Sequence, residues 1–234
     1  KQAELLHRIN RGIAVDTGKL LLTEYLETWL REVVAVRNRP RTVESYAVIV
    51  TNHIVPVLGH ILLSKLQAAD VQQLEAGLLA SGLSSNTVRH VHIALSKALK
   101  DAMRGGVVHQ NVCEAVEAPS PGVYEVKAPD PNAIRQILVQ ANAGTYGAIL
   151  QFMAFTGVRR GEAVGLSWQN VDLERRVVSI VSTAQRLQGK GIVLQPPKSA
   201  AGRRGIAIDS GTVDMLRAHR GKQLILELAL GGSF

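Results

Sequence analysis

Cysteine is nearly absent from this chain of 234 residues, in which Cys113 is the single example. A lone cysteine excludes an intramolecular disulfide and leaves no cysteine cluster for a structural zinc ion. The sequence therefore fits the reducing conditions of a cytosol.

Long apolar runs and targeting signals are also missing. No stretch reaches the ~18 consecutive apolar residues of a membrane span. The first twelve residues, KQAELLHRINRG, lack the apolar core of a signal peptide. We therefore expect a cytoplasmic protein without a membrane partner. The chain also shows no internal repeat and no low-complexity tract.

What the chain does contain is typical of a folded protein with sizeable cores. Hydrophobic residues make up 46% and charged residues 20% of it, which differs from the composition of disordered chains. The length favours two domains, although one domain is also compatible with it.

Positive charge is in excess and unevenly distributed. The formal net charge is +8. Residues 1–118 hold 13 Lys and Arg against 11 Asp and Glu, whereas residues 119–234 hold 14 against 8. Basic surfaces attract phosphate polyanions, so nucleic acid is the leading candidate partner. A solvated basic face with no partner is the simpler alternative.

Proline marks the boundary between the two halves. Four of the eight prolines lie in APSPGVYEVKAPDPN, residues 118–132. Because proline lacks a backbone donor and fixes φ, this segment disfavours helix and sheet. We expect a linker over residues 119–131, between a domain at 15–118 and another at 132–234. Residues 1–14 are expected to be the end of an upstream helix or linker, with a short helix at 2–10.

The first half has the apolar spacing of four helices. The first covers residues 21–36, with Thr23 as its expected N-cap. The second should begin at Thr42 and end near His53, because Pro56 disfavours helix in the preceding residue. The third ends at Gly82, and the fourth covers residues 84–106. The lone histidines are expected to be surface or core residues rather than metal ligands.

The fourth helix has a second, polar face. Its beginning carries small polar side chains, which with a helix N-terminus form good phosphate contacts. Ordinary capping and a solvated face are the alternative. The candidate DNA contacts on this helix are Ser85, Asn86, Thr87, Arg89, His92, Lys97 and Lys100.

The second half mixes helices and strands. Helices are expected over 131–144, 147–157, 160–166 and 210–230, and the nearly all-apolar 147–157 should be buried. Three short strands are expected at 176–181, 191–196 and 203–208, with turns between them. The fold class predicted for the whole chain is α+β, mainly α, with a small three-stranded antiparallel sheet.

Between two of these helices, FTGVRRGEAVGLSW places charge at a helix break inside an apolar region. An arginine there would project from a corner fixed by packing, as bidentate phosphate recognition requires. Glu162 follows Arg159 by three residues and can pair with its guanidinium or cap the second helix. A buried Arg159–Glu162 ion pair that only holds the corner explains the pattern equally well.

The segment TGVRRGEAVGLSWQNVD resembles the first conserved box of the tyrosine recombinases, the phage-integrase family, T-G-x-R-x-x-E-x-x-x-L-x-W-x-x-[IV]-D, and it fills every place. PPKSAAGRRGIAI resembles the family's lysine segment, K-[ST]-x-x-[SG]-x-R-x-[IV]-x-[IL]. The resemblance implies that Arg159 and Lys198 are catalytic. We expect Glu162 to support them, and Arg203 and Arg204 to contact DNA.

The first half resembles the family's SAM-like core-binding domain, through YLETWL, RTVESYAVIVTNHIVPVLG and the long segment that begins LSSNTVRHVHIAL. The resemblance covers about residues 15–230. It implies double-stranded DNA as partner, self-association as a tetramer on DNA, no cofactor or metal, and a prokaryotic or phage origin, with the protein associated with the nucleoid. Its context would be the integration of mobile elements.

Two departures from the family pattern limit the prediction. The H-x-x-R box is missing, and the four tyrosines all precede Arg159, whereas the family's nucleophile follows that box. We therefore interpret residues 132–234 as the first part of a truncated catalytic domain and expect the chain by itself to be inactive. Its function is either that of a site-specific recombinase seen in part, or that of a non-catalytic DNA-binding remnant or regulator of integrase origin.

Overall fold

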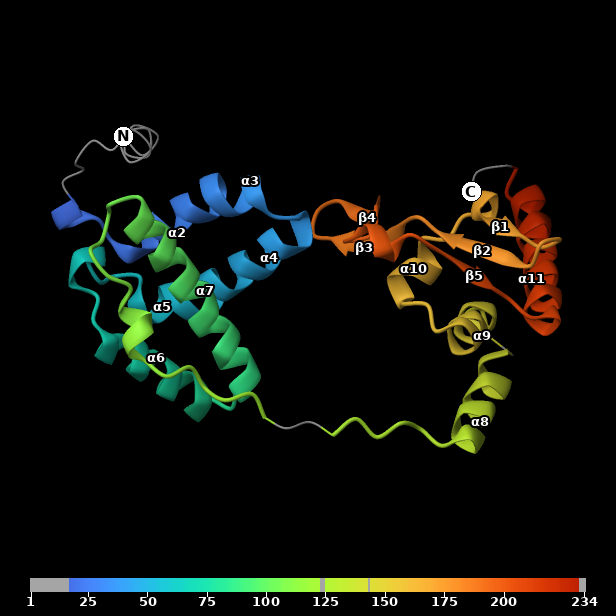
Figure 1. The fold of residues 1–234 in the computed structure, drawn as a ribbon, viewed down its shortest axis with the longest axis horizontal. Helices are drawn as coiled ribbons and strands as arrows, with labels where there is room; N and C mark the ends of the chain where they lie inside the picture. The colour runs from blue at the N-terminus through green and yellow to red at the C-terminus, as the bar shows by residue number, and fades with distance from the viewer. Residues whose placement is uncertain (1–16, 123–124, 143, 232–234) are drawn as a thin grey trace. The chain divides into compact units, whose positions relative to one another are not determined.

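The computed structural model describes residues 17–122, 125–142 and 144–231. Contacts divide the chain into two compact units, Lys1–Glu125 and Val126–Phe234, and each is described by itself (Figure 1). The division falls within the proline-rich segment, but the finer boundaries given above stay predictions. The short helix expected at residues 2–10 lies outside the described residues.

After a 3-10 turn at Thr17–Lys19, the first unit continues with one helical run in three parts. α2 (Leu22–Trp29) passes through a wide π-turn, Leu30–Val34, into the single turn α3 (Ala35–Arg37). Thr23 is not the N-cap, contrary to the prediction. Leu21 precedes the helix, and its N–H donates to the Glu24 carboxylate at 3.1 Å. The Glu24 carboxylate in the first turn thus satisfies the N–H of the residue before the helix, and no N-cap hydroxyl takes part.

The second helical run passes the proline at which it was predicted to stop. α4 (Pro40–Ile49) leads into a π-turn, Val50–Ile54, and then α5 (Val55–Leu58). The end near His53 is therefore wrong. The wide turn lets the N–H of Val55 bond Val50, and Pro56 then falls in the first turn of α5, where its missing N–H has little cost.

Two further helices complete a helical unit, as predicted. They are α6 (Ala68–Ala80) and α7 (Ser85–Arg104), followed by a 3-10 turn at Val112–Ala115. α7 buries its predicted apolar stripe against α2 and the π-turn of the second run. The indole of Trp29 lies in this core and donates to Asp101 at 2.9 Å. The buried positions of the stripe are Val88, Val91, Leu95, Ala98, Leu99 and Ala102.

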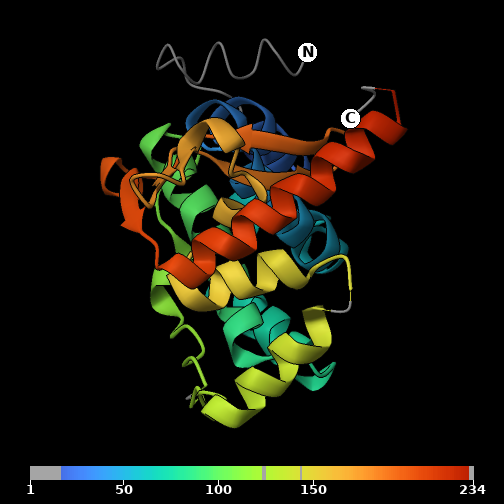
Figure 2. The same ribbon diagram turned by 90° about the vertical axis from the view of Figure 1, so that its right-hand side faces the viewer.

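The second unit starts with three helices. α8 (Pro131–Asn142) is followed by α9 (Gly147–Thr156) and the short α10 (Arg160–Val164). The long closing helix α11 (Ser210–Ala229) packs against α9, as Figure 2 shows. α9 is not buried as its composition predicted, since Leu150 and Phe155 are 40% and 62% exposed. It meets the rest of the unit through one face only, and none of the described residues covers the other.

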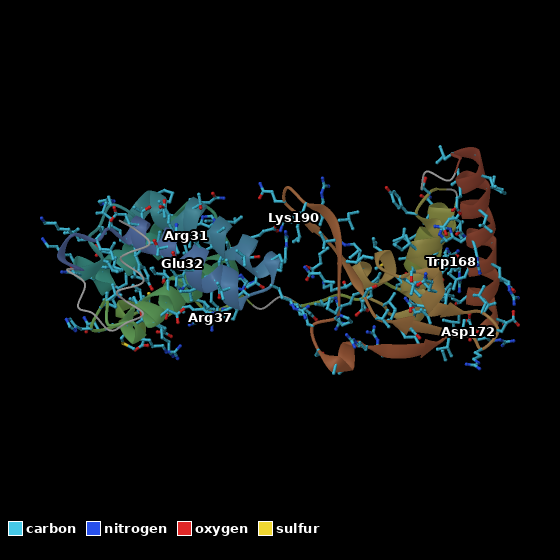
Figure 3. All side chains as sticks on the ribbon, turned by 90° about the horizontal axis from the view of Figure 1, so that it is seen from above. Arg31, Glu32, Arg37, Trp168, Asp172 and Lys190 are labelled. Atoms are coloured by element: carbon cyan, nitrogen blue, oxygen red, sulfur yellow. The ribbon has the colours of Figure 1, made fainter. Side chains whose placement is uncertain are left out.

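The strands form two separate antiparallel pairings. β1 (Val171–Asp172), β2 (Val177–Ile180) and β5 (Arg204–Ala207) make a three-stranded sheet in the order β1-β2-β5. β3 (Thr183–Leu187) and β4 (Gly191–Gln195) make a hairpin, and Lys190 lies at its tip (Figure 3).

Strand membership therefore differs from the prediction. The strand at 191–196 pairs with β3, and the third member of the main sheet is the two-residue β1. β1 is too short to give an alternating pattern, and β3 reads TAQRL, in which polar residues interrupt the apolar ones. Alternation is the signal on which strand prediction depends, so neither segment was detected.

The core of the second unit lies between the main sheet, α9 and α11. Val178 and Ile180 contribute from β2, Phe152 from α9, and Val213 and Leu216 from α11. Val158, in the link from α9 to α10, belongs to the same cluster and anchors the corner described next. Among the described residues, no helix has both the length and the apolar character needed to cross a membrane.

Candidate functional site

The corner between α9 and α10 is fixed on both sides by the backbone. Gly157 ends α9 with φ 66°, in the left-handed region that suits glycine, and its N–H donates to Met153 at 2.9 Å. Val158 is 4% exposed, so the chain is held in the core immediately before Arg159. Arg159 is the N-cap residue of α10 and has extended backbone angles.

α10 also packs unusually close to the hairpin. A Cβ at Gly161 would lie 2.6 Å from Thr183 Oγ1 and 2.9 Å from the carbonyl oxygen of Ala184. The hydroxyl of Ser182 donates to the carbonyl of Gly165 at 2.6 Å. The absence of a side chain at Gly161 therefore lets β3 support the helix that carries the candidate site.

Glu162 lies at the centre of the corner. Its carboxylate is buried and accepts the backbone N–H of Arg159 at 3.0 Å and the Nη1 of the same residue at 3.0 Å. Arg204 on β5 donates to both oxygens, from Nη1 at 3.1 Å and from Nη2 at 2.8 Å. Two arginines from distant parts of the sequence thus meet at one carboxylate.

The hydrogen bonds at this carboxylate lower its pKa, so that Glu162 is ionised at neutral pH. The hydrogen bond from Arg204, with the two from Arg159, lowers the pKa of Glu162 to about 2, although burial acts in the opposite direction. The same bond raises the pKa of Arg204. Charge-assisted bonds to a carboxylate favour its ionised form, which accounts for both directions.

The structure combines the two alternatives that the sequence left open for the corner. Glu162 forms the buried ion pair, yet the side chain of Arg159 is 80% exposed. Arg159 therefore holds the corner with one Nη group and leaves the rest of its guanidinium at the surface. Arg160 is exposed beside it.

Lys198 and Arg203 precede Arg204 in the sequence, but neither forms a hydrogen bond or ion pair with the described residues of the corner. Both are exposed, on the segment between β4 and β5 that leads to Arg204. Among the described residues, Lys198 forms no hydrogen bond or ion pair, in contrast to Arg159, Glu162 and Arg204. No group of three potential metal ligands occurs in the described part of the chain either.

The start of α7 is organised by a residue that the sequence reasoning passed over. Ser84 is the N-cap, and its hydroxyl accepts the N–H of Thr87 at 3.2 Å and lies 2.8 Å from the Thr87 hydroxyl. Thr87 is half-buried, as is Ser85, and Asn86 is exposed. The expected polar cluster is present, with local capping as part of its role.

The basic candidates on α7 differ in their surroundings. Lys97 and Lys100 are exposed, and the Lys97 ammonium lies 5.3 Å from the centroid of the Tyr46 ring. Arg89 is half-buried and donates to the carbonyl of Pro119 at 3.2 Å. It therefore ties α7 to the segment that leaves the unit.

The prediction that His92 contacts DNA is wrong. Its ring is buried, and Nδ1 lies 2.6 Å from the carboxylate of Glu75, which is also buried. His92 follows the buried Val91 and faces α6, not solvent. It joins two helices inside the core, and we withdraw it from the candidate DNA contacts.

Arg204 was predicted as a DNA contact, but it pairs with the buried Glu162 instead. The sequence reasoning missed this pairing, although the sequence carried a signal for it. Along β5 and the residue that follows it, side chains at 204, 206 and 208 share one face. Ile208 belongs to the core cluster of the unit, and Ile206 packs against that cluster. An arginine in phase with two core residues points inward and requires a buried partner. Arg203, out of phase, is exposed.

A cleft of about 360 Å³ lies between α9, the 3-10 turn Trp168–Asn170 and α11. Its polar lining joins Trp168 to α11. The Trp168 indole donates to Gln223 at 2.7 Å, and the ring centroids of Trp168 and His219 are 6.3 Å apart. Figure 3 shows Trp168 beside this helix. His219 is half-buried, and burial, with nearby Lys222, lowers its pKa.

Residues 21–79 match the family described as phage integrase, N-terminal SAM-like domain. A protein named tyrosine recombinase XerC-like, from Caldanaerobacter subterraneus subsp. tengcongensis, is 26% identical over an alignment that covers all of this chain and 64% of the relative. An integrase of Streptomyces ambofaciens is 30% identical over 74% of this chain and 45% of its own length. The chain thus spans less than two thirds of these relatives.

Solved structures share the fold. The Tn1549 transposon integrase, determined in complex with transposon right end DNA, superposes with a TM-score of 0.74 at 17% identity over 85% of this chain and 64% of that one. A lambda integrase, determined as a tetramer bound to a Holliday junction, gives a TM-score of 0.57 at 16% identity over 84% of this chain and 55% of the other.

Proposed function

Since this chain is a relative of the tyrosine recombinases, we propose that it is the DNA-binding part of a site-specific recombinase or integrase and carries two members of its active site. The observation that supports this most directly is the Arg159 corner. An ionised, buried Glu162 holds an arginine whose side chain is 80% exposed, in a motif that fills every place of the family's first box.

In this proposal, Arg159 binds the scissile phosphate and stabilises the extra negative charge that develops on its oxygens during strand cleavage. A guanidinium preorganised by Glu162 stabilises that charge without reorganisation. Lys198, a mobile point charge with a titratable proton, protonates the leaving 5′-oxygen. These roles require no metal. The attacking tyrosine is not one of the four in these 234 residues.

Duplex DNA is the proposed partner of both units. In the first unit, the proposed contacts lie on α7, at Ser85, Asn86, Thr87, Arg89, Lys97 and Lys100. In the second unit, Arg203 is exposed on the segment before β5 and adds a phosphate contact. Since the matched lambda integrase structure is a tetramer on a DNA junction, we further propose that this protein self-associates on DNA. Because the curated relatives are bacterial proteins, we also propose that it acts at the nucleoid, in the cytoplasm.

The second candidate is a DNA-binding regulator or remnant without chemistry. It is favoured by one observation, the position of all four tyrosines before Arg159. The full reading frame separates the two candidates. An H-x-x-R box followed by a tyrosine beyond residue 234 supports the enzyme, and a stop codon at that point supports the remnant.

The DNA-binding proposal is tested by fluorescence anisotropy across a salt series. Each phosphate that a Lys or Arg neutralises contributes about −0.9 to the slope of log K against log salt. We expect a steep slope that becomes shallower by about 2 in the variant Lys97→Gln/Lys100→Gln. The matched control is Arg31→Gln, since Arg31 is exposed but lies outside α7 and pairs with Glu32. A slope near zero for the unmodified chain is incompatible with the proposal.

A further inference from the structure

The two arginines at Glu162 bind it in different ways. Arg204 uses both Nη groups, one on each carboxylate oxygen, and is 33% exposed. Arg159 uses one Nη group on a single oxygen and is 80% exposed. Arg204 is further held by the carbonyl of Gly202, which its Nη1 reaches at 3.3 Å. Arg204 therefore uses both of its Nη groups on the carboxylate, whereas Arg159 uses only one.

The carboxylate has no capacity left for further donors. An ionised carboxylate offers about four acceptor positions. Here they receive four donors, the backbone N–H and Nη1 of Arg159 and the two Nη groups of Arg204. Arg204 therefore occupies the positions that the remainder of the Arg159 guanidinium would otherwise take.

We propose that Arg204 is a positioning residue that satisfies Glu162 and thereby keeps the outer edge of Arg159 free for a phosphate group. Glu162 alone would be a poor support for Arg159, because a carboxylate and a guanidinium with no competitor form a bidentate pair. Such a pair would cancel the charge of Arg159 and turn its donors inward. Arg204, which lies on β5, prevents this outcome because it fills half of the acceptor positions of Glu162.

Desolvation explains why Arg159 would move if Arg204 were lost. Glu162 is 5% exposed, so solvent cannot replace two missing donors. A buried charged group with vacant hydrogen-bond positions is costly, and the nearest mobile donors belong to Arg159. The guanidinium of Arg159 would therefore rotate onto both oxygens. The use of its free edge for a DNA phosphate rests on the proposed function, whereas the division of roles between the arginines does not.

The experiment measures the chemical accessibility of Arg159 in the full chain. Phenylglyoxal modifies exposed guanidinium groups, and tandem mass spectrometry assigns the modification rates of Arg159 and its exposed neighbour Arg160 separately. We expect Arg204→Gln to slow modification of Arg159 several-fold while leaving the rate at Arg160 unchanged. Arg203→Gln, at the exposed neighbouring position, is the matched control and should alter neither rate.

A compensating variant separates positioning from a general loss of structure. In Glu162→Gln/Arg204→Gln no charge remains to capture Arg159, so its modification rate should return to that of the unmodified chain. If Arg204→Gln fails to fold, as circular dichroism would show, Arg204→Lys replaces it. Lysine is a point charge that cannot form the two-point contact, so Arg159 should be partly protected. An unchanged or faster rate at Arg159 in the folded variant overturns the proposal.

A second measurement connects the result to DNA. In the salt series, Arg159→Gln, Arg204→Gln and the double variant should all make the slope shallower by the same amount, about 0.9, because Arg204 acts through Arg159. Reductions that add in the double variant mean that Arg204 contacts a phosphate itself, and they overturn the proposal. If the unmodified chain shows no salt-dependent binding, the proposed function fails while the labelling result still decides the role of Arg204.

Discussion

At the scale of single residues, two histidines on α7 show how position on a helix outweighs residue type. His90 is exposed, whereas His92 is buried and bonded to Glu75. We predict that His92→Ala lowers the free energy of unfolding of the first unit by about 1–3 kcal/mol, because it leaves the buried Glu75 without its partner. Urea denaturation in a Trp168→Phe background measures the change, because Trp29 then reports on the first unit alone.

His90→Ala is the control for that prediction. It removes the same side chain from the same helix without exposing a buried partner, and its effect should stay within about 0.5 kcal/mol. Equal losses in the two variants would mean that helix propensity, not the Glu75 contact, determines the result.

The ionisation of Glu162 gives the second unit a dependence on pH. Its pKa is lowered to about 2 in the folded state, chiefly by the hydrogen bond from Arg204, against about 4.3 when unfolded. A lowered pKa means that the contribution to stability is complete above about pH 4.5 and is lost as the pH falls towards 2. We predict a loss of up to about 3 kcal/mol over this range.

Urea denaturation in a Trp29→Phe background measures this loss, because Trp168 then reports on the second unit. Asp209 also has a lowered pKa, caused by the hydrogen bonds from Thr212 at the start of α11, so both Glu162→Gln and Asp209→Asn are compared. Glu162→Gln should remove most of the pH dependence and Asp209→Asn a smaller part. The reverse order would contradict the account of the corner.

At the scale of elements, the contact between α10 and β3 depends on a missing side chain. Because a Cβ at Gly161 would lie 2.6 Å from Thr183 Oγ1 and 2.9 Å from a backbone oxygen, the helix would have to shift. We predict that Gly161→Ala destabilises the second unit by about 1–3 kcal/mol. Urea denaturation followed by Trp168 fluorescence, in the same Trp29→Phe background, measures the change in stability.

The control for this contact is Gly221→Ala, on α11. A Cβ there meets no other atom within 4 Å, and alanine is the better helix former, so this variant should be neutral or more stable by up to about 1 kcal/mol. If Gly161→Ala is equally harmless, the close packing of α10 on β3 does not determine the position of Arg159.

Local sequence patterns predicted most helices. They did not predict where one helical run continues past a proline, or which distant residues pair. The stripe of α7 and the ends of α6 and α9 follow from apolar spacing and from Gly82 and Gly157. The passage through Pro56 was not predictable, because a π-turn depends on the packing of the whole run. In the site, Glu162 was located through its spacing from Arg159. Its pairing with Arg204 joins residues 42 positions apart, and no local pattern specifies such a contact.

At the scale of the whole molecule, exposed apolar residues are concentrated on the second unit. Leu224, Ile225 and Leu228 on α11 are 50%, 68% and 81% exposed, and Phe155 on α9 is 62% exposed. A concentration of exposed apolar side chains commonly marks a contact with another part of an assembly. The basic surface proposed for DNA lies elsewhere, on α7 and around Lys198 and Arg203. We therefore expect the apolar residues of α9 and α11 to contact protein, and the proposed basic residues to contact DNA.

The chemistry of the four tyrosines leads to the last prediction, that this chain binds DNA without forming a covalent link to it. Tyr25 is buried and donates to the carbonyl of Ala98 at 2.7 Å, and its burial raises its pKa. Tyr46 packs edge-on against Trp29 in the first unit. Tyr146 precedes α9 and lines the apolar cleft, and Tyr124 lies outside the described residues. A nucleophilic hydroxyl must lie in line with the phosphate at about 3–3.5 Å. We therefore expect no shifted band when the chain is incubated with a labelled, nicked suicide substrate and separated under denaturing conditions.

A band that survives denaturation and disappears on Tyr146→Phe or Tyr124→Phe would place the nucleophile within this chain and contradict the proposed division of the active site.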